Sequence, residues 1–164
     1  VEQLVGQADL VVHGTVVEQH SAWNQEHTYL YTYSSIDVVE RWKGQAHTGQ
    51  KLVVRQWGGT DGDLEQVLYG DAKFKVGDEV VLFLRPNTKE PIYHLVAMSL
   101  GKYSVDRSGQ QPSLIRDIHG LHLAPSPGTE QIAAGNHVPD VSKVAMSDLR
   151  ARVLKLAAPV RKAP

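Results

Sequence analysis

The stretch VVRQWGGTDGDLEQ, residues 53–66, joins an alternating apolar segment to a run of glycine and aspartate. Carboxylates spaced like Asp61 and Asp63 open the calcium loop of EF-hands, which also requires glycine at position six and glutamate at position twelve. Those positions hold Gln66 and Ala72, so the calcium pattern fails. Glycine is typical of turns that need positive φ, and aspartate of solvated loops. The stretch therefore predicts a loop, whose use depends on its neighbours.

Eight histidines raise the possibility of a zinc or iron site. His119 and His122 are three residues apart, a spacing that can chelate a metal from a helix or a turn. His13 and His20 lie in one expected strand and at its end. No HExxH motif accompanies them, and no acidic residue stands in the register of such a site. We therefore predict no metal and no cofactor, and keep a metal-dependent enzyme built on a His cluster as an alternative.

Other catalytic signatures are missing from the sequence. It holds no G-x-S-x-G elbow, and no local pattern selects a Ser, His and Asp set. The neighbouring carboxylates Asp78 and Glu79 fall at an expected turn, where solvation accounts for them. The absence of cysteine excludes disulfides, thiolate nucleophiles and Cys-ligated zinc. The sequence thus predicts no catalytic residue and a non-enzymatic protein.

Aromatic residues beside the expected loops are the better candidates for binding. Trp23 belongs to a polar turn expected at 20–27, and Trp57 and Tyr69 flank the glycine and aspartate run. Aromatic side chains on a rim give large contact areas at low entropic cost. The alternatives are that Trp57 plugs the end of a barrel and that Trp23 packs on the first hairpin. Six residues are predicted to bind a partner: Trp23, His27, Trp57, Asp61, Asp63 and Tyr69.

Three tyrosines, Tyr29, Tyr31 and Tyr33, alternate on one face of an expected strand. Such a row either stacks on sugars or bases or forms the cover under a helix, and we expect the cover. A binder of glycans or single-stranded nucleic acid remains an alternative function. The formal charge is −1, from 17 basic and 18 acidic residues, so we predict no nucleic-acid partner.

The length of 164 residues suits a single domain over 1–164. No apolar run reaches about 18 residues, so we expect no membrane span. The first residue is Val1 rather than methionine, which suits a mature product whose signal peptide is gone. We therefore expect an exported protein, periplasmic or extracellular.

The segments that would position these residues have a period of two through most of the chain. A short helix is expected at 1–8 and a helix at about 147–158, capped by Ser147. Gly14 indicates a bend or a close backbone approach, and Val39 an extra residue in a β-bulge. Strands are expected at 9–19, 28–44, 51–57, 79–86, 91–98, 101–106 and 113–123. The pattern predicts a mainly β fold, a small closed barrel over about 9–120 followed by a loop at 121–141.

The order of these segments is distinctive. ADLVVHGTVVEQ, a long strand ending in VVERWKG, a third strand, GG and FKVGDEVVLFL follow one another. This order resembles the netrin-like OB-fold module of the tissue inhibitors of metalloproteinases, and exported bacterial proteins of unknown function on the same frame. The likeness covers residues 1–106.

The resemblance implies a five-stranded Greek-key OB-fold barrel that binds a protein, such as a protease or a cell-surface component. It also implies that residues 1–7, 21–27 and 58–70 form one contact edge. The animal inhibitors chelate the zinc of their target through an N-terminal cysteine held by a disulfide. This chain has no cysteine, so that inhibitory mechanism does not carry over.

Overall fold

The structure is a computed structural model that describes residues 1–117 and 141–158. The described elements are, in chain order, α1 (Glu2–Gln7), β1 (Leu10–Trp23), β2 (Leu30–Lys43), β3 (Lys51–Trp57), β4 (Gly59–Asp61), β5 (Leu64–Gln66), β6 (Glu79–Pro86), β7 (Tyr93–Leu95), a 3₁₀ turn η1 (Met98–Gly101), β8 (Lys102–Asp106), β9 (Ser113–Asp117), β10 (Val141–Ala145) and α2 (Met146–Ala157). The mainly β fold and the two terminal helices are as predicted.

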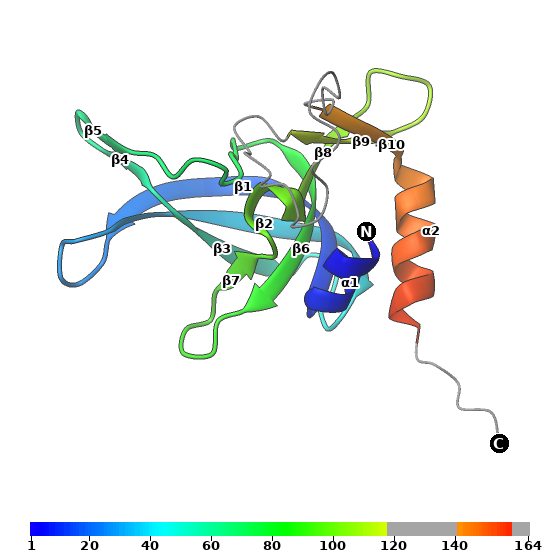
Figure 1. The fold of residues 1–164 in the computed structure, drawn as a ribbon, viewed down its shortest axis with the longest axis horizontal. Coiled ribbons are helices and arrows are strands. Elements are labelled where there is room, and N and C mark those ends of the chain that lie inside the picture. Colours follow the sequence, from blue (N-terminus) through cyan, green and yellow to red (C-terminus); the bar gives the residue numbers. More distant parts are fainter. Residues whose placement is uncertain (118–140, 159–164) are drawn as a thin grey trace, which may run out of the picture.

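Five of the described strands close into a barrel (Figure 1). Around the barrel they run β1-β2-β3-β7-β6, and β6 returns to pair with β1. β3 and β7 are parallel and meet at Val54 and Tyr93, whereas the other neighbours are antiparallel. β8, β9 and β10 extend the sheet outward from β6. The predicted closed barrel is confirmed, and its strand order is consistent with an OB-fold-like barrel.

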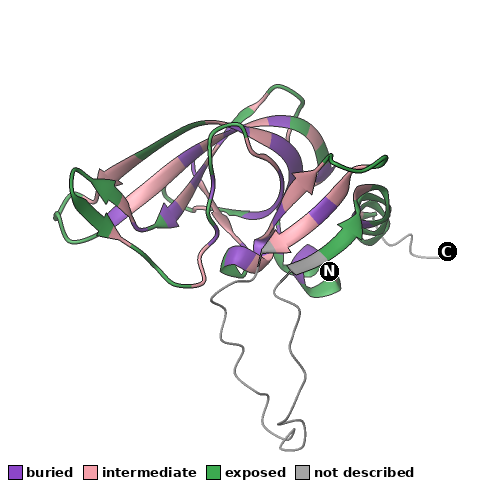
Figure 2. Cartoon of the chain, turned by 90° about the horizontal axis from the view of Figure 1, so that it is seen from above, coloured by how far each residue is buried: buried purple, intermediate pink, exposed green. Residues whose placement is uncertain are grey.

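Alternate residues of β1 and β6 feed two separate cores. One core fills the barrel, and the other lies between its outer wall and the two helices. The barrel core contains Leu10, Val12, Val16, Ile36, Val38, Leu52, Val54, Phe74, Val80, Leu82 and Leu84. The outer core contains Leu4, Val5, Val11, Trp42, Val81, Phe83, Tyr103, Leu114, Leu149 and Val153. Because both faces of β6 are buried, its sequence is a continuous apolar run rather than an alternating one. Figure 2 shows buried residues along the strands around the barrel, whereas the ends of the long hairpins are exposed.

Two local expectations for β1 and β2 are confirmed. His13 pairs with Glu40 and Gly14 with Val38, so Val39 is the extra residue of a β-bulge. A Cβ atom at Gly14 would lie 2.6 Å from the carbonyl oxygen of Asp37, so this position requires a close backbone approach.

Several boundaries differ from the prediction. β1 continues to Trp23, which pairs with Leu30, because polar residues 19–23 still find cross-strand partners. The turn is therefore 24–29 rather than 20–27. α2 begins at Met146 with Ala145 as its N-cap, and Ser147 does not cap it. Val141, expected in the loop at 121–141, starts β10, and residues 118–140 lie outside the described part.

Candidate functional site

The glycine and aspartate run is a β-hairpin, which projects from the barrel beyond the end of β3 (Figure 1). We call residues 57–70 the arm. β4 and β5 pair from Gly59 and Gln66 to Asp61 and Leu64, which leaves Gly62 and Asp63 as the turn. The predicted loop is thus wrong in detail. Strands of three residues are too short to show a period in the sequence.

Hydrogen bonds fasten the arm to the β1–β2 hairpin. The indole nitrogen of Trp23 donates to Asp61 Oδ2 over 2.6 Å. The backbone amide of Thr60 donates to Ser21 Oγ over 3.1 Å. The amide of Gly58 donates to the carbonyl of Leu30 over 2.8 Å. Residues 21–27 and 58–70 therefore lie side by side, as the resemblance implies.

Two of the predicted binding residues support the arm. Trp23 is half-buried, and the His27 ring stacks on it with centroids 5.1 Å apart. Since Asp61 accepts the indole hydrogen bond, its carboxylate is engaged in holding the arm to β1. Asp63 is exposed at the hairpin turn and has no hydrogen bond or ion pair with a described residue.

Trp57 does not plug the barrel. It is 50% exposed and packs edge-on to Tyr29, the residue before β2, at 5.3 Å, and tilted to Tyr31 of β2 at 4.8 Å. The Arg55 guanidinium lies 4.7 Å from the Tyr31 ring centre. Tyr29 is 53% exposed, and α2 packs at the Trp42 end of β2. The described helices therefore do not cover the tyrosine row, contrary to expectation.

Large apolar side chains are exposed along the arm and at its base. Tyr69 is 86% exposed, the most of any large hydrophobic residue in the described part. We call these residues the arm surface: Tyr29, Trp57, Leu64, Val67, Leu68 and Tyr69. Exposed large apolar side chains concentrated on one projecting segment are typical of sites of protein interaction.

Beneath the arm a cavity of about 370 Å³ opens between β1, β2, β3 and residues 65–74. Its floor is polar, because the apolar core of the barrel gives way to Gln19, Ser34 and Gln56 at this end. Gln56, only 7% exposed, donates to Asp71 Oδ1 and to the carbonyl of Ala72. Leu52, Val54 and Gln56 alternate inward along β3, so a polar residue at the third inward position was a signal of the cavity in the sequence.

Asp71 is the acidic group in the wall of the cavity nearest to the buried Gln56. Burial raises the pKa of its carboxyl, and hydrogen bonds from the backbone of Ala72 and Trp57 and the side chain of Gln56 oppose the rise. Asp71 has no signal in the sequence, since only the fold shows that this aspartate is half-buried.

The N-terminal segment does not join this site. α1 packs against α2 and β6 at the far end of the barrel from the arm (Figure 1). Its apolar residues Leu4 and Val5 are buried in the outer core. Residues 1–7 therefore lie apart from residues 21–27 and 58–70, and the three segments do not form the single edge that the resemblance implies.

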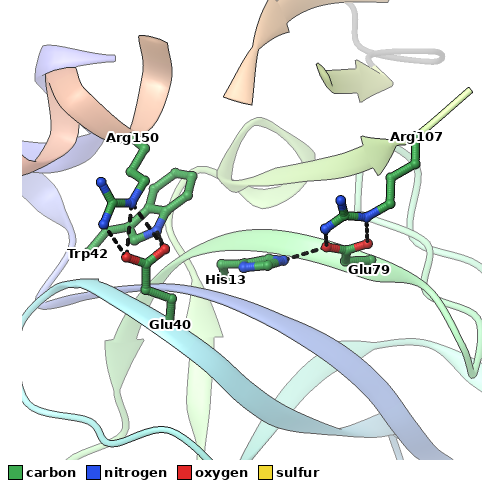
Figure 3. Close-up of polar contacts among 6 residues, drawn as sticks. All are labelled: His13, Glu40, Trp42, Glu79, Arg107 and Arg150. Atoms are coloured by element: carbon green, nitrogen blue, oxygen red, sulfur yellow. Dashed lines mark hydrogen bonds and ion pairs between the residues drawn. The ribbon is translucent and has the colours of Figure 1, made fainter. Parts of the chain in front are cut away.

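The buried histidine belongs to a polar network remote from the arm (Figure 3). His13, 6% exposed, lies 2.7 Å from Glu79 Oε1 through Nε2, and Arg107 holds both oxygens of Glu79 at 2.7 and 2.5 Å. These contacts lower the pKa of Glu79, with the Arg107 hydrogen bonds the largest cause. The network ties β1, β6 and the segment after β8 together and lines none of the described cavities.

A second network in the same view fastens α2. The Arg150 guanidinium contacts both oxygens of Glu40, which also accepts a hydrogen bond from the Trp42 indole over 3.0 Å. His20 of β1 stacks on Tyr33 with ring centroids 5.2 Å apart. Within residues 1–117 and 141–158, no three His, Asp or Glu side chains gather as metal ligands. His119 and His122 lie outside the described residues.

No family model matches the chain, and no curated protein matches it. Neither of the two helices that the structure describes has the length and apolar character needed to cross a bilayer.

Proposed function

We propose that the protein is a non-enzymatic binding module that recognises a protein partner through the arm surface. The observation that supports the proposal most is the exposure of Trp57 and Tyr69 on a hairpin fixed to the barrel. A protein that kept these side chains only for stability would bury them, whereas aromatic anchors at interfaces begin exposed. The proposed partner is a protease or a cell-surface component, by resemblance to the netrin-like modules.

The same resemblance supports an exported protein, periplasmic or extracellular. Fractionation of cells that express the full-length protein with an epitope tag tests the location directly. The expected result is recovery outside the cytoplasm, and recovery with a cytoplasmic marker enzyme contradicts it.

The rival of an enzyme lacks support from the geometry. His13 is buried, its carboxylate partner is held by Arg107, and the described cavities do not reach it. The glycan alternative needs parallel exposed ring faces, whereas Tyr29 and Trp57 meet at 90° and Tyr31 is covered by Arg55. A protein interface accommodates such mixed ring orientations more readily.

Photocrosslinking tests the binding surface. A photoreactive phenylalanine at position 69 should capture a partner from the exported fraction of the source organism, and the captured protein is then produced for binding assays. Tyr69→Ala should weaken binding by about tenfold or more without lowering the melting temperature, because this side chain is 86% exposed. Leu156→Ala, an exposed apolar truncation on α2, is the matched control and should leave affinity unchanged. Equal affinity of the parent protein, Tyr69→Ala and Leu156→Ala for the captured protein contradicts the proposal.

A further inference from the structure

Two glutamine side-chain amides in the wall of the cavity already donate their hydrogen bonds within the protein. The Gln19 amide nitrogen donates to Ser34 Oγ and to the carbonyl of Phe74. The Gln56 amide nitrogen donates to Asp71 and to the carbonyl of Ala72. A carbonyl oxygen cannot donate, so these two backbone contacts fix which end of each amide points into the wall.

The amide oxygens of both glutamines therefore remain acceptors, although Lys73 and the Trp57 indole, which also line the cavity, still carry donors. Gln19 Oε1 and Gln56 Oε1 accept no hydrogen bond from any residue in the described part of the chain. Asp71 adds a carboxylate beside Gln56. The remaining side-chain amide donor is that of Gln66, whose oxygen accepts from the amide of Leu30 over 3.0 Å. Gln56 is buried whereas Gln19 is exposed, and a ligand that brings donors would pair the open oxygen of each.

Charge points the same way. Among the side chains that line the cavity, Glu65 and Asp71 are acidic, Lys73 is basic and His20 is titratable. With Asp71 ionised and His20 neutral, the wall carries a net charge of −1 (one lysine against two carboxylates). The arm itself, residues 57–70, holds Asp61, Asp63 and Glu65 and no lysine or arginine. A metal ion is the weaker fit, because three His, Asp or Glu ligands do not converge here or elsewhere in the described residues.

We propose that the cavity receives the cationic side chain of a lysine or arginine from the protein partner, flanked by apolar residues that pack on the arm surface. The ammonium or guanidinium donates to Gln56 Oε1 and Asp71, and Gln19 Oε1 serves a further N–H. This inference rests on the proposed function and adds the chemistry of the partner segment. A volume of about 370 Å³ is at the small end of ligand pockets, which suits one side chain rather than a whole small molecule.

Small model compounds test the cavity without the partner. Nα-acetyl-lysine methylamide carries the ammonium, and Nα-acetyl-norleucine methylamide has the same aliphatic chain without it. In NMR titrations the lysine compound should shift the side-chain amide signals of Gln56 in a saturable manner at millimolar concentration. The norleucine compound should shift residues of the arm surface only. Equal shifts of Gln56 with both compounds, or no saturable shift with the lysine compound, overturn the proposal.

Two variants locate the effect. Asp71→Asn keeps the shape and the acceptor oxygen and should weaken the lysine compound about tenfold, since a charge-assisted hydrogen bond is lost. Asp63→Asn removes the same charge at the exposed turn outside the cavity, and should change the affinity less than twofold. Equal weakening by the two variants shows general electrostatic attraction and contradicts a site at Asp71.

The pH dependence of binding distinguishes a direct contact of the lysine compound with Asp71 from a purely structural role of that residue. Burial raises the pKa of Asp71 in the free protein, so binding of the lysine compound should weaken as the pH falls through that pKa. The other charged or titratable groups around Asp71 are His20, Glu65 and Lys73 in the same cavity and Lys102 in the adjoining one. In Asp71→Asn the part of the loss due to Asp71 should vanish, and an unchanged profile overturns its role.

If the lysine compound does not enter the cavity while Tyr69→Ala still loses the partner, the cavity assignment alone fails. If the compound enters and the arm variants keep full affinity for the captured protein, the proposed binding surface fails instead.

Discussion

Gly58 should be the residue that decides whether the arm stays docked. Its φ of +85° is in the left-handed region, and a Cβ atom there would collide with the carbonyl oxygen of Gln66 on the facing side of the arm. An alanine in this conformation costs about 1–2 kcal/mol, and overpacking against backbone adds about 1–3 kcal/mol. Gly58→Ala should therefore destabilise the docked arm by about 2–5 kcal/mol.

Gly62 at the hairpin turn is the matched control. Its φ is +56°, and a Cβ atom there would meet nothing within 4 Å. Gly62→Ala carries the conformational cost alone, about 1–2 kcal/mol. The difference in destabilisation between the two variants measures the steric cost of a Cβ atom at Gly58, separately from the conformational cost that both variants share.

Native-state hydrogen exchange separates the arm from the barrel. The amides of Gly58 and Thr60 donate to Leu30 and Ser21, so their protection reports docking of the arm. Protection of Thr60 should fall about 30-fold or more in Gly58→Ala, because 1.4 kcal/mol corresponds to a factor of ten. Amides of β6 in the barrel core should exchange as in the parent protein. Equal losses in Gly58→Ala and Gly62→Ala, or a matching loss in β6, refute the reasoning.

Three further outcomes are expected. Gly14→Ala should destabilise the protein by about 2 kcal/mol in urea denaturation, since its Cβ would lie 2.6 Å from a carbonyl oxygen of β2. The Arg107 hydrogen bonds hold the pKa of Glu79 below 4.5, so Glu79→Gln should lower the melting temperature above pH 5, and the difference from the parent should shrink as the pH falls through that depressed pKa. Leu149→Ala should lower the free energy of unfolding by about 2–5 kcal/mol, because this side chain is on the buried face of α2. Leu154→Ala, on the exposed face of the same helix, should lower it by less than about 1 kcal/mol in the same assay.

The barrel could be predicted because its strands carry strong local patterns. Leu52 and Val54 alternate with polar neighbours in β3, and the continuous run of β6 reflects burial on both faces. Val39 broke the alternation of β2, and this break located the bulge. Each signal lies within a few residues, so no tertiary information was needed.

The candidate site could be predicted only in part, because its geometry depends on distant contacts. Trp57 and Tyr69 stand out by residue type, but their exposure depends on how the arm leaves the barrel. The position of α1 depends on its packing with α2, which follows more than a hundred residues later. Asp71 has no distinctive sequence neighbourhood, and its burial follows from the approach of β3.

The parallel contact between β3 and β7 makes the barrel mechanically uneven. β1 and β2 pair along nearly their whole length, whereas the ladder between β3 and β7 has a single residue pair, Val54 with Tyr93. The ion pair of Arg55 with Glu90, 2.7 Å, spans the same junction, beside a cleft of about 280 Å³. Because β3 and β7 share so short a ladder, the barrel should open at this junction first when it is strained. Arg55 also lies over Tyr31, on which Trp57 packs. An opening of this junction would therefore loosen the packing at the base of the arm.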